Sequence, residues 1–255
     1  MALIRCQFES DVLGMTSSLL VALPDSAKYR RSRRKYACLF LLHGLGDDES
    51  IWQRRTSIER YLDELDLRLA VVMPCGHRSF YSDMKSGLKY WTYLSREVPA
   101  VARHFLPISE KREDAFAAGN SMGGYGAFKL ALRCPDRFAA AASLSGALDM
   151  AHRVEDPKNS IADFSLIYGD PVRVRNTDDD LLALLAKRRW STPAAPQFYQ
   201  CCGVSDFLYQ DNLRFRDAAK KCGLKLTYEE GPGDHDWGYW DQQIKRVLKW
   251  LPLKK

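Results

Sequence analysis

One pentapeptide constrains this chain more than any other feature. Residues 119–123 read Gly-Asn-Ser-Met-Gly, which matches the pattern G-x-S-x-G with Ser121 at its centre. This pattern is typical of a sharp turn from a strand into a helix, with the serine held in a strained conformation and exposed. The apolar run 115–118 precedes the turn and the small-residue stretch 124–132 follows it. We therefore predict that Ser121 is a catalytic nucleophile held at a strand-to-helix turn; the alternative is a tight turn whose serine is only structural.

Strand-like and helix-like segments alternate along most of the 255 residues, which predicts a mostly parallel sheet flanked by helices. Short, fully apolar runs fit strands that are buried on both faces. We expect strands at residues 2–8, 17–23, 38–42, 69–73, 115–118, 138–144, 197–202 and 225–229. We expect helices at residues 57–65, 93–105, 124–132, 210–222 and 241–251. Together with the serine turn, this alternation predicts the α/β-hydrolase fold in a single domain over residues 1–255.

The segment 151–196 breaks this alternation. It is rich in charge, with three consecutive aspartates at 178–180 before an apolar stretch at 181–185. We interpret it as a cap-like insertion of short helices above the strand ends, because such insertions often form a cap in this fold. A helical excursion that never touches a substrate is the alternative.

The composition is that of a globular protein, with 46% hydrophobic and 27% charged residues. The apolar stretch 138–148 is too short to cross a bilayer, and charges near the N-terminus are atypical of a secretory signal. An odd, scattered set of cysteines predicts reduced thiols and a cytoplasmic location. None of them forms a C-x-x-C pair or a Cys/His cluster with zinc-ligand spacing, so we expect neither a metal nor a cofactor. These are Cys6, Cys38, Cys75, Cys134, Cys201, Cys202 and Cys222.

A basic run at residues 30–35 contributes much of the net charge of +6. Such a run can bind nucleic acid or an anionic surface. No interleaved aromatic platform and no nucleic-acid motif accompanies it. We therefore interpret the run as a solvated loop and expect no nucleic-acid partner.

A serine hydroxyl needs a base to remove its proton, and in this fold the acid and then the histidine follow the serine along the chain. Only His152 and His235 come after Ser121. His152 begins the insertion with no strand before it. His235 lies in a turn-rich loop just after the expected strand 225–229, where the base must lie. We predict His235 as the general base.

The acid should lie between the serine and the histidine, just past a strand. Asp206 satisfies this, because it follows the strand 197–202 and a glycine. Its carboxylate would bond one ring nitrogen of His235 and fix the tautomer. Asp211 is the weaker rival, because it falls inside the expected helix 210–222. We predict Asp206 as the orienting acid.

When a serine attacks an acyl carbon, a tetrahedral intermediate with an oxyanion forms. We expect two backbone N–H groups to bind this oxyanion. Met122 opens the helix after the serine, where N–H groups lack partners and the helix dipole is positive. The second donor should come from the loop after an earlier strand, here His43-Gly44-Leu45-Gly46. We assign it to Leu45, with Gly44 as the nearest competitor. His43 is expected to shape this turn by packing.

These motifs together resemble the esterase D branch of the α/β-hydrolases, and most closely the bacterial tributyrin-type esterases. The resemblance covers nearly the whole chain and is weakest over 151–196. It is carried by five segments in the family's order: His43-Gly44, Ser79-Phe80-Tyr81-Ser82-Asp83-Met84, Lys111-Arg112-Glu113-Asp114, Gly119–Gly124 and Gly233-Asp234-His235-Asp236-Trp237.

The resemblance implies hydrolysis of short-chain acyl esters without metal or cofactor. It also implies that residues 79–84 lie near the acyl or alcohol pocket, and we therefore expect Tyr81 to contact substrate. We expect the same of Gly44 and Trp237, which belong to two other segments of the resemblance. Related proteins include S-formylglutathione hydrolases and carbohydrate acetyl or feruloyl esterases, and these activities are the alternatives for this chain. Acyl transfer to another acceptor, and a non-catalytic binding protein on the same fold, also stay open. A homo-oligomer is possible.

Overall fold

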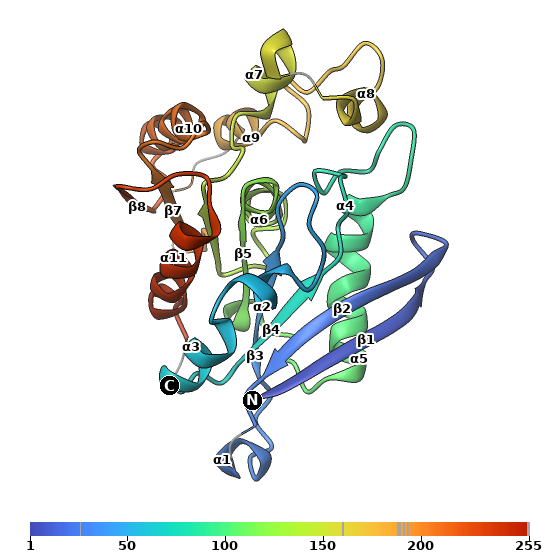
Figure 1. Cartoon of the computed structure of the whole chain (residues 1–255), viewed down its shortest axis with the longest axis vertical. Coiled ribbons are helices and arrows are strands. Elements are labelled where there is room, and N and C mark those ends of the chain that lie inside the picture. The colour runs from blue at the N-terminus through green and yellow to red at the C-terminus, as the bar shows by residue number, and fades with distance from the viewer. Residues whose placement is uncertain (26, 160, 188–189, 191, 193, 254–255) are drawn as a thin grey trace.

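The computed structural model describes residues 1–25, 27–159, 161–187, 190, 192 and 194–253. In these residues eight strands form one sheet in the order β1-β2-β4-β3-β5-β6-β7-β8 (Figure 1). The pairs β1–β2 and β2–β4 are antiparallel, and all other neighbours are parallel. The strands are β1 (Ala2–Ser10), β2 (Met15–Leu23), β3 (Ala37–Leu42), β4 (Leu69–Pro74), β5 (Ala115–Asn120), β6 (Ala140–Leu144), β7 (Gln197–Gly203) and β8 (Leu226–Gly231).

Helices cover both faces of this sheet. A π-helical turn, η1 (Tyr93–Glu97), joins α4 to α5, and short 3₁₀ turns occur at η2 (Arg112–Asp114) and η3 (Pro157–Asn159). The α-helices are α1 (Ala27–Arg30), α2 (Ile51–Arg55), α3 (Ile58–Glu64), α4 (Tyr90–Thr92), α5 (Val98–Phe105), α6 (Met122–Arg133), α7 (Met150–Glu155), α8 (Asp163–Tyr168), α9 (Leu181–Ala186), α10 (Tyr209–Lys221) and α11 (Trp237–Trp250).

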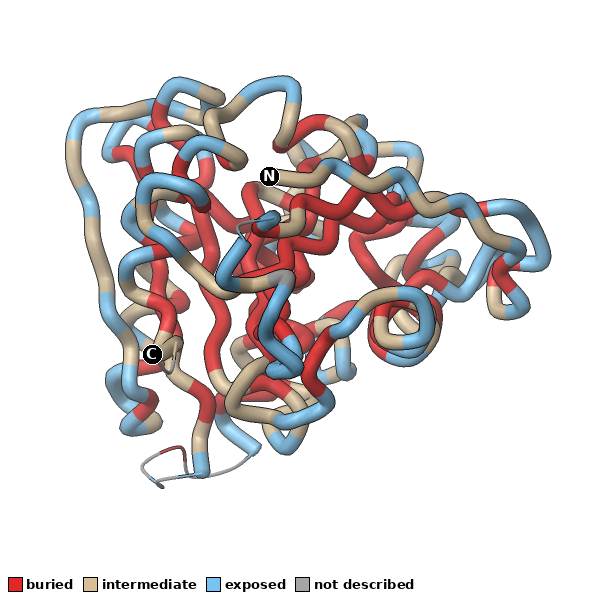
Figure 2. The backbone as a smooth tube through the Cα atoms, turned by 90° about the horizontal axis from the view of Figure 1, so that it is seen from below, coloured by how far each residue is buried: buried red, intermediate tan, exposed pale blue. Residues whose placement is uncertain are grey.

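The sheet separates two hydrophobic cores. In β3, Phe40 and Leu42 belong to the core that α5, α6 and α10 cover, whereas Leu39 and Leu41 belong to the core beneath α3 and α11. This division follows from the alternation of side chains along a strand. It explains why β3 and β4 are apolar throughout, as the sequence predicted for strands buried on both faces. The buried residues gather at the centre of the molecule in Figure 2.

Helix boundaries differ most from the sequence expectations in two places. The expected helix 93–105 is divided into η1 and α5 and is preceded by the short α4; Pro99 lies in the first turn of α5, where its missing N–H costs nothing. The last helix begins at Trp237 rather than at residue 241. The side chain of Asp236 accepts a hydrogen bond from the backbone N–H of Tyr239 at 3.0 Å and so caps this earlier start.

The segment 151–196 contributes α8, α9 and most of α7, which lie at the end of the molecule opposite α1 (Figure 1). Because α1 precedes β3, this is the end at which the parallel strands terminate. The ring of Phe164 in α8 packs edge-on against Phe80, 5.6 Å between centroids, and Phe80 packs against Tyr125 of α6. Residues 160, 188, 189, 191 and 193 of the segment lie outside the described residues.

Candidate active site

The structure brings Ser121, Asp206 and His235 together. The Nε2 atom of His235 lies 3.0 Å from Oγ of Ser121, and its Nδ1 atom lies 3.0 and 2.9 Å from the two carboxylate oxygens of Asp206. Ser121 follows β5, Asp206 follows β7 and His235 follows β8. These strands lie on the parallel side of one sheet, so their carboxyl ends place the three loops at the same edge.

Ser121 adopts a strained backbone conformation, with φ 53° and ψ −118°. A non-glycine residue rarely has such a positive φ, and this strain is typical of functional sites. Hydrogen bonds from both sides hold it in place. The N–H of Ser121 donates to Leu144 at 3.0 Å, and its carbonyl oxygen accepts from Tyr125 and Ala147. The turn therefore has the geometry that its sequence predicted.

The two glycines of the pentapeptide permit close backbone contacts around Ser121. A Cβ atom at Gly119 would lie 2.5 Å from the backbone of Gly123 and 2.6 Å from the carbonyl oxygen of Leu42. One at Gly123 would overlap that same oxygen and lie 2.8 Å from the carbonyl oxygen of His43. Side chains are excluded at both positions because the turn packs directly against the end of β3.

Asp206 is buried and accepts a further hydrogen bond, from the N–H of Leu208 at 2.8 Å. The loop that carries it is tied to the histidine loop: the N–H of Val204 donates to Gly231, and that of Ser205 donates to Gly233. These contacts hold the loop of Asp206 against the loop of His235.

Two aromatic rings flank the imidazole of His235. The ring of Trp240 meets it edge-on at 4.8 Å and is buried, whereas the ring of Phe207 lies 4.5 Å away and is 64% exposed. Neither residue was predicted as part of the site. The only sequence signal for Phe207 is its position directly after Asp206.

Met122 and the loop after β3, the two predicted sources of backbone donors, both lie next to Ser121. Met122 is the first residue of α6, so its N–H has no partner within the helix. A Cβ atom at Gly44 would lie 3.6 Å from Cβ of Ser121, which shows that this loop runs beside the serine. Leu45, the next residue, is partly exposed.

The side chain of His43 supports the loop after β3 through two hydrogen bonds. Its ring is buried; Nδ1 donates to the carbonyl oxygen of Gly44, and Nε2 accepts from the N–H of Gly76, each at 2.8 Å. Burial lowers the pKa of His43 to about 4, because the charged form loses its hydration. A neutral ring is the state that can accept the bond from Gly76. His43 therefore shapes the turn, as expected.

We expected Tyr81 to contact substrate, but its side chain is buried under the loop beside Ser121. Its side chain is 1% exposed, and its hydroxyl donates to the carbonyl oxygen of His43 at 2.9 Å. Its ring fills the space that glycines leave, since a Cβ atom at Gly126 would lie 2.5 Å from it. Tyr81 thus supports the loop beside Ser121 rather than facing a ligand. Trp237 is partly exposed and packs edge-on against Trp52.

The rival residues are engaged elsewhere. Asp211 is a buried residue of α10 that forms ion pairs with Arg153 and Arg214. His152 lies in α7, where its backbone N–H donates to the capping side chain of Asp149. Among the described contacts, neither Asp211 nor His152 takes the place of Asp206 or His235 beside Ser121.

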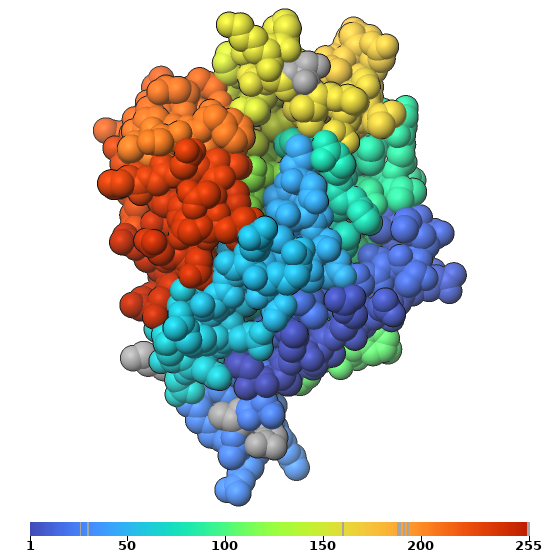
Figure 3. Space-filling view, in the orientation of Figure 1, coloured from blue at the N-terminus to red at the C-terminus, as the bar shows by residue number. Residues whose placement is uncertain are grey.

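Three segments of the chain border the candidate site on the surface. In Figure 3 the segments coloured yellow, orange-red and blue surround a recess with a green floor. By the colour bar, the yellow segment is the region of α7 and α8, the orange-red segment is the chain after β7, and the blue segment is the loop after β3. The green floor is the region of β5 and α6. Across the part of the chain that is described, no group of His, Cys, Asp and Glu could hold a metal ion. Within those same residues no helix is long and apolar enough to span a membrane.

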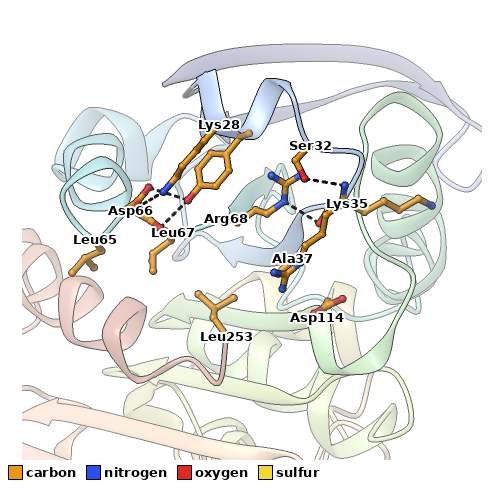
Figure 4. Close-up of a pocket in the computed structure, with 12 residues that line it drawn as sticks. Lys28, Ser32, Lys35, Ala37, Leu65, Asp66, Leu67, Arg68, Asp114 and Leu253 are labelled. Carbon is orange, nitrogen blue, oxygen red and sulfur yellow. Dashed lines mark hydrogen bonds and ion pairs between the residues drawn. The ribbon is translucent and has the colours of Figure 1, made fainter. Parts of the chain in front are cut away.

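A separate cavity of about 560 Å³ lies at the opposite, amino-terminal edge of the sheet (Figure 4). Part of the basic run lines it, and residues 31–35 are exposed, as predicted for a solvated loop. Its lysines have acidic partners: Lys28 pairs with Asp66 and Lys35 with Glu110. This cavity does not reach the candidate active site.

Comparisons with known proteins identify the family of this chain. The family model described as "Putative esterase" matches residues 10–251. An acetyl esterase of Caldicellulosiruptor saccharolyticus is 30% identical, and the match covers 98% of both chains. The chain belongs to the esterase family. The esterase is also 39% identical to the serine hydrolase FphF of Staphylococcus aureus, with a TM-score of 0.90 and 99% of each chain covered.

A second solved structure, S-formylglutathione hydrolase (FrmB) of Staphylococcus aureus, is 39% identical with a TM-score of 0.85 over 98% of each chain. A ferulic acid esterase at 23% identity and a TM-score of 0.82 shares the fold. The protein is thus a serine esterase with an α/β-hydrolase fold, as predicted from its serine turn and its alternation of strands and helices.

Proposed function

We propose that Ser121 is the nucleophile of this esterase, His235 its general base and Asp206 the acid that orients the base. The observation that carries the proposal is the unbroken hydrogen-bonded chain from the Ser121 hydroxyl through the imidazole to the buried carboxylate. With the Nδ1 proton directed at Asp206, the Nε2 lone pair faces the serine hydroxyl.

In this mechanism the Oγ atom of Ser121 attacks the acyl carbon while Nε2 of His235 takes its proton. The C–O bond to the alcohol then breaks, and the alcohol leaves with the proton from Nε2. Water repeats the sequence on the acyl-enzyme, giving the carboxylic acid and the free serine. Asp206 stabilises the imidazolium that forms in both halves.

The oxyanion would be bound by the backbone N–H groups of Met122 and Leu45, with Gly44 as the competitor for the second. The start of α6 supports the first donor, and the proximity of the Gly44 loop to Ser121 supports the second. Donors fixed in place before the reaction are worth about 10²–10³ in kcat each.

For the substrate we propose short-chain acyl esters, in the manner of the tributyrin-type enzymes of the esterase D branch. The relative named as an acetyl esterase, matched over 98% of this chain, supports a small acyl group. Gly44 and Trp237 remain our candidates for substrate contacts. The proposed steps need neither metal nor cofactor.

A second candidate is a thioester such as S-formylglutathione, because a protein of that name is 39% identical over 98% of the chain. The same triad would act, with a thiol as the leaving group. Parallel rates on matched oxygen esters and thioesters separate the two candidates.

The proposal is tested by labelling with a fluorophosphonate probe and by turnover of p-nitrophenyl esters from acetate to octanoate. We expect one label per chain on Ser121, no label on Ser121→Ala, and a rate maximum at acetate or butyrate. Labelling of Ser121→Ala at the wild-type rate would refute the nucleophile, and a maximum at octanoate would refute the short-chain preference.

For the location we propose the cytoplasm. All seven cysteines are free thiols in the structure. Burial raises the pKa of the Cys38, Cys201 and Cys202 thiols, which keeps them protonated and unreactive. A reducing compartment suits such a set.

A further inference from the structure

Phe207 is a large aromatic residue placed in solvent at the rim of the site. It is 64% exposed, and Val204 on the same loop is 47% exposed. The ring of Phe207 lies 4.5 Å from the imidazole of His235. Trp240 contacts that imidazole too, but Trp240 is buried, so Phe207 is the ring on the solvent side.

The chemistry of the site determines which part of an ester reaches Phe207. The leaving oxygen must come within hydrogen-bond distance of Nε2, because that atom returns the proton to it. Nε2 belongs to the ring against which Phe207 packs. A substituent on the leaving oxygen therefore extends into the space beside Phe207, whereas the acyl group is held on the side of the oxyanion donors.

The charges around Phe207 show which leaving groups this space suits. The guanidinium of Arg153 in α7 lies over the Phe207 ring, 5.6 Å from its centre. Its charge is matched by Asp211, and the neighbouring Arg214 bonds both Asp211 and Asp149. Two cations and two carboxylates leave this cluster without net charge. The surface beside His235 thus offers an aromatic face and no net attraction for an anionic group.

We propose that Phe207 is a specificity-determining residue that stacks on the leaving group and favours esters of alcohols bearing an aromatic ring. This inference rests on the proposed triad. Aromatic pairs with centroids 4.5–7 Å apart add about 0.5–1.5 kcal/mol beyond simple burial, which corresponds to about two- to tenfold in kcat/KM.

The test compares kcat/KM for three acetates of unactivated alcohols: benzyl, cyclohexylmethyl and ethyl. Benzyl and cyclohexylmethyl acetate are similar in size and reactivity and differ in the aromatic ring. In the wild type we expect benzyl acetate to exceed cyclohexylmethyl acetate by about two- to tenfold. In Phe207→Ala we expect this ratio to fall to about 1. Phe105→Ala, which removes a 59% exposed ring in α5, is the matched control and should keep the wild-type ratio.

Three results would overturn the inference. Equal rates on benzyl and cyclohexylmethyl acetate in the wild type would show that no aromatic preference exists. An unchanged ratio in Phe207→Ala would place the preference elsewhere. A uniform loss on all three esters, with the ratio kept, would make Phe207 a support for His235 only. A wild type that neither turns over any ester nor reacts with the fluorophosphonate would instead refute the proposed function itself, and the inference with it.

Discussion

The Nε2 atom of His235 lies 3.0 Å from the Oγ atom of Ser121, although 114 residues separate the two in sequence. The sheet accounts for this proximity, because β5 and β8 lie in its parallel part and end at the same edge. The two loops would still be free to diverge without the contacts between the Asp206 loop and the chain at 231–233. The hydroxyl and its base therefore meet through the fold itself.

Replacing Asp206 by asparagine should lower kcat on p-nitrophenyl acetate by about 10⁴. The amide group would donate to Nδ1 and stabilise the tautomer that carries its proton on Nε2, which cannot accept the serine proton. The Leu208 N–H bond to Oδ1 can persist, so the fold should be kept. Steady-state kinetics and the rate of fluorophosphonate labelling both report the loss.

The control for this change is Asp234→Asn. Asp234 is exposed, and its Oδ1 atom accepts only from the neighbouring N–H of His235 among the bonds described, a role that an amide oxygen can keep. We expect less than a twofold change in kcat. If Asp206→Asn kept more than a tenth of the wild-type rate, Asp206 would have no place in the mechanism.

Replacing Gly123 by alanine should disrupt the serine turn. The new methyl group would overlap the carbonyl oxygen of Leu42 and crowd that of His43, so the end of β3 or the start of α6 must shift. Overpacking of this kind costs about 1–3 kcal/mol or more. We expect a lower midpoint in urea unfolding and little or no labelling of Ser121.

Gly231→Ala is the matched control, because a Cβ atom at that position meets nothing within 4 Å. It should change the free energy of unfolding by less than about 1 kcal/mol, as open positions usually do. Equal stability and equal labelling of the two variants would contradict the packing argument for the turn.

Much of the fold and the geometry of the candidate site followed from local sequence signals. Buried strands such as β3 are short apolar runs, and the serine turn requires glycines at fixed positions. The order of serine, acid and histidine then left few candidates, and the structure joins Ser121, Asp206 and His235 by hydrogen bonds. These features were predictable because each depends on a few neighbouring residues.

Features that depend on distant contacts were not predictable. Tyr81 is buried because Gly76 and Gly126, far apart in sequence, both leave room for its ring. Phe207 borders the site only because β8 places His235 beside the loop after β7. The earlier start of α11 depends on the Asp236 cap, whose sequence signal is weak beside the turn-rich stretch before it.

The buried neutral ring of His43 predicts acid sensitivity. Its pKa is about 4 in the folded chain, whereas an unfolded histidine titrates near 6.5. Between these values the unfolded chain binds more protons, so stability falls as the pH falls from about 7 to 4. With these two pKa values, the free energy of unfolding should fall by about 2 kcal/mol between pH 8 and pH 5. Urea unfolding at a series of pH values measures it.

His43→Gln tests the assignment of this loss. Glutamine can accept the bond from the Gly76 N–H without titrating, so the decline in stability between pH 8 and pH 5 should be shallower than in the wild type. His104→Gln, which alters an exposed histidine, should keep the wild-type slope. A His43→Gln curve parallel to the wild type would assign the acid sensitivity to other groups.

The ion pair between Lys129 and Asp179 should be the most costly one to break. Lys129 of α6 is completely buried and also donates to Ser82 at 2.7 Å, while Asp179 lies in the segment 151–196. Burial lowers the pKa of Lys129; burial alone would raise that of Asp179, but the Lys129 ammonium leaves it below its usual value. Asp179→Ala should cost about 3 kcal/mol of unfolding free energy, because it strands a buried charge.

The double variant Lys129→Met/Asp179→Ala distinguishes a stranded charge from a lost contact. It removes both charges and fills the site with an apolar chain, so it should be more stable than Asp179→Ala alone. The deficit of Asp179→Ala should also shrink as the pH rises toward the ordinary lysine pKa of 10.5, since the stranded lysine loses its proton in the folded state before it does in the unfolded one. The exposed pair Arg175–Glu155 is the control, and Glu155→Ala should lower the stability far less than Asp179→Ala does, because water screens exposed charges. A double variant less stable than Asp179→Ala would mean that the Lys129 ammonium stabilises the fold through Ser82 and the carbonyl of Tyr81 even without its partner.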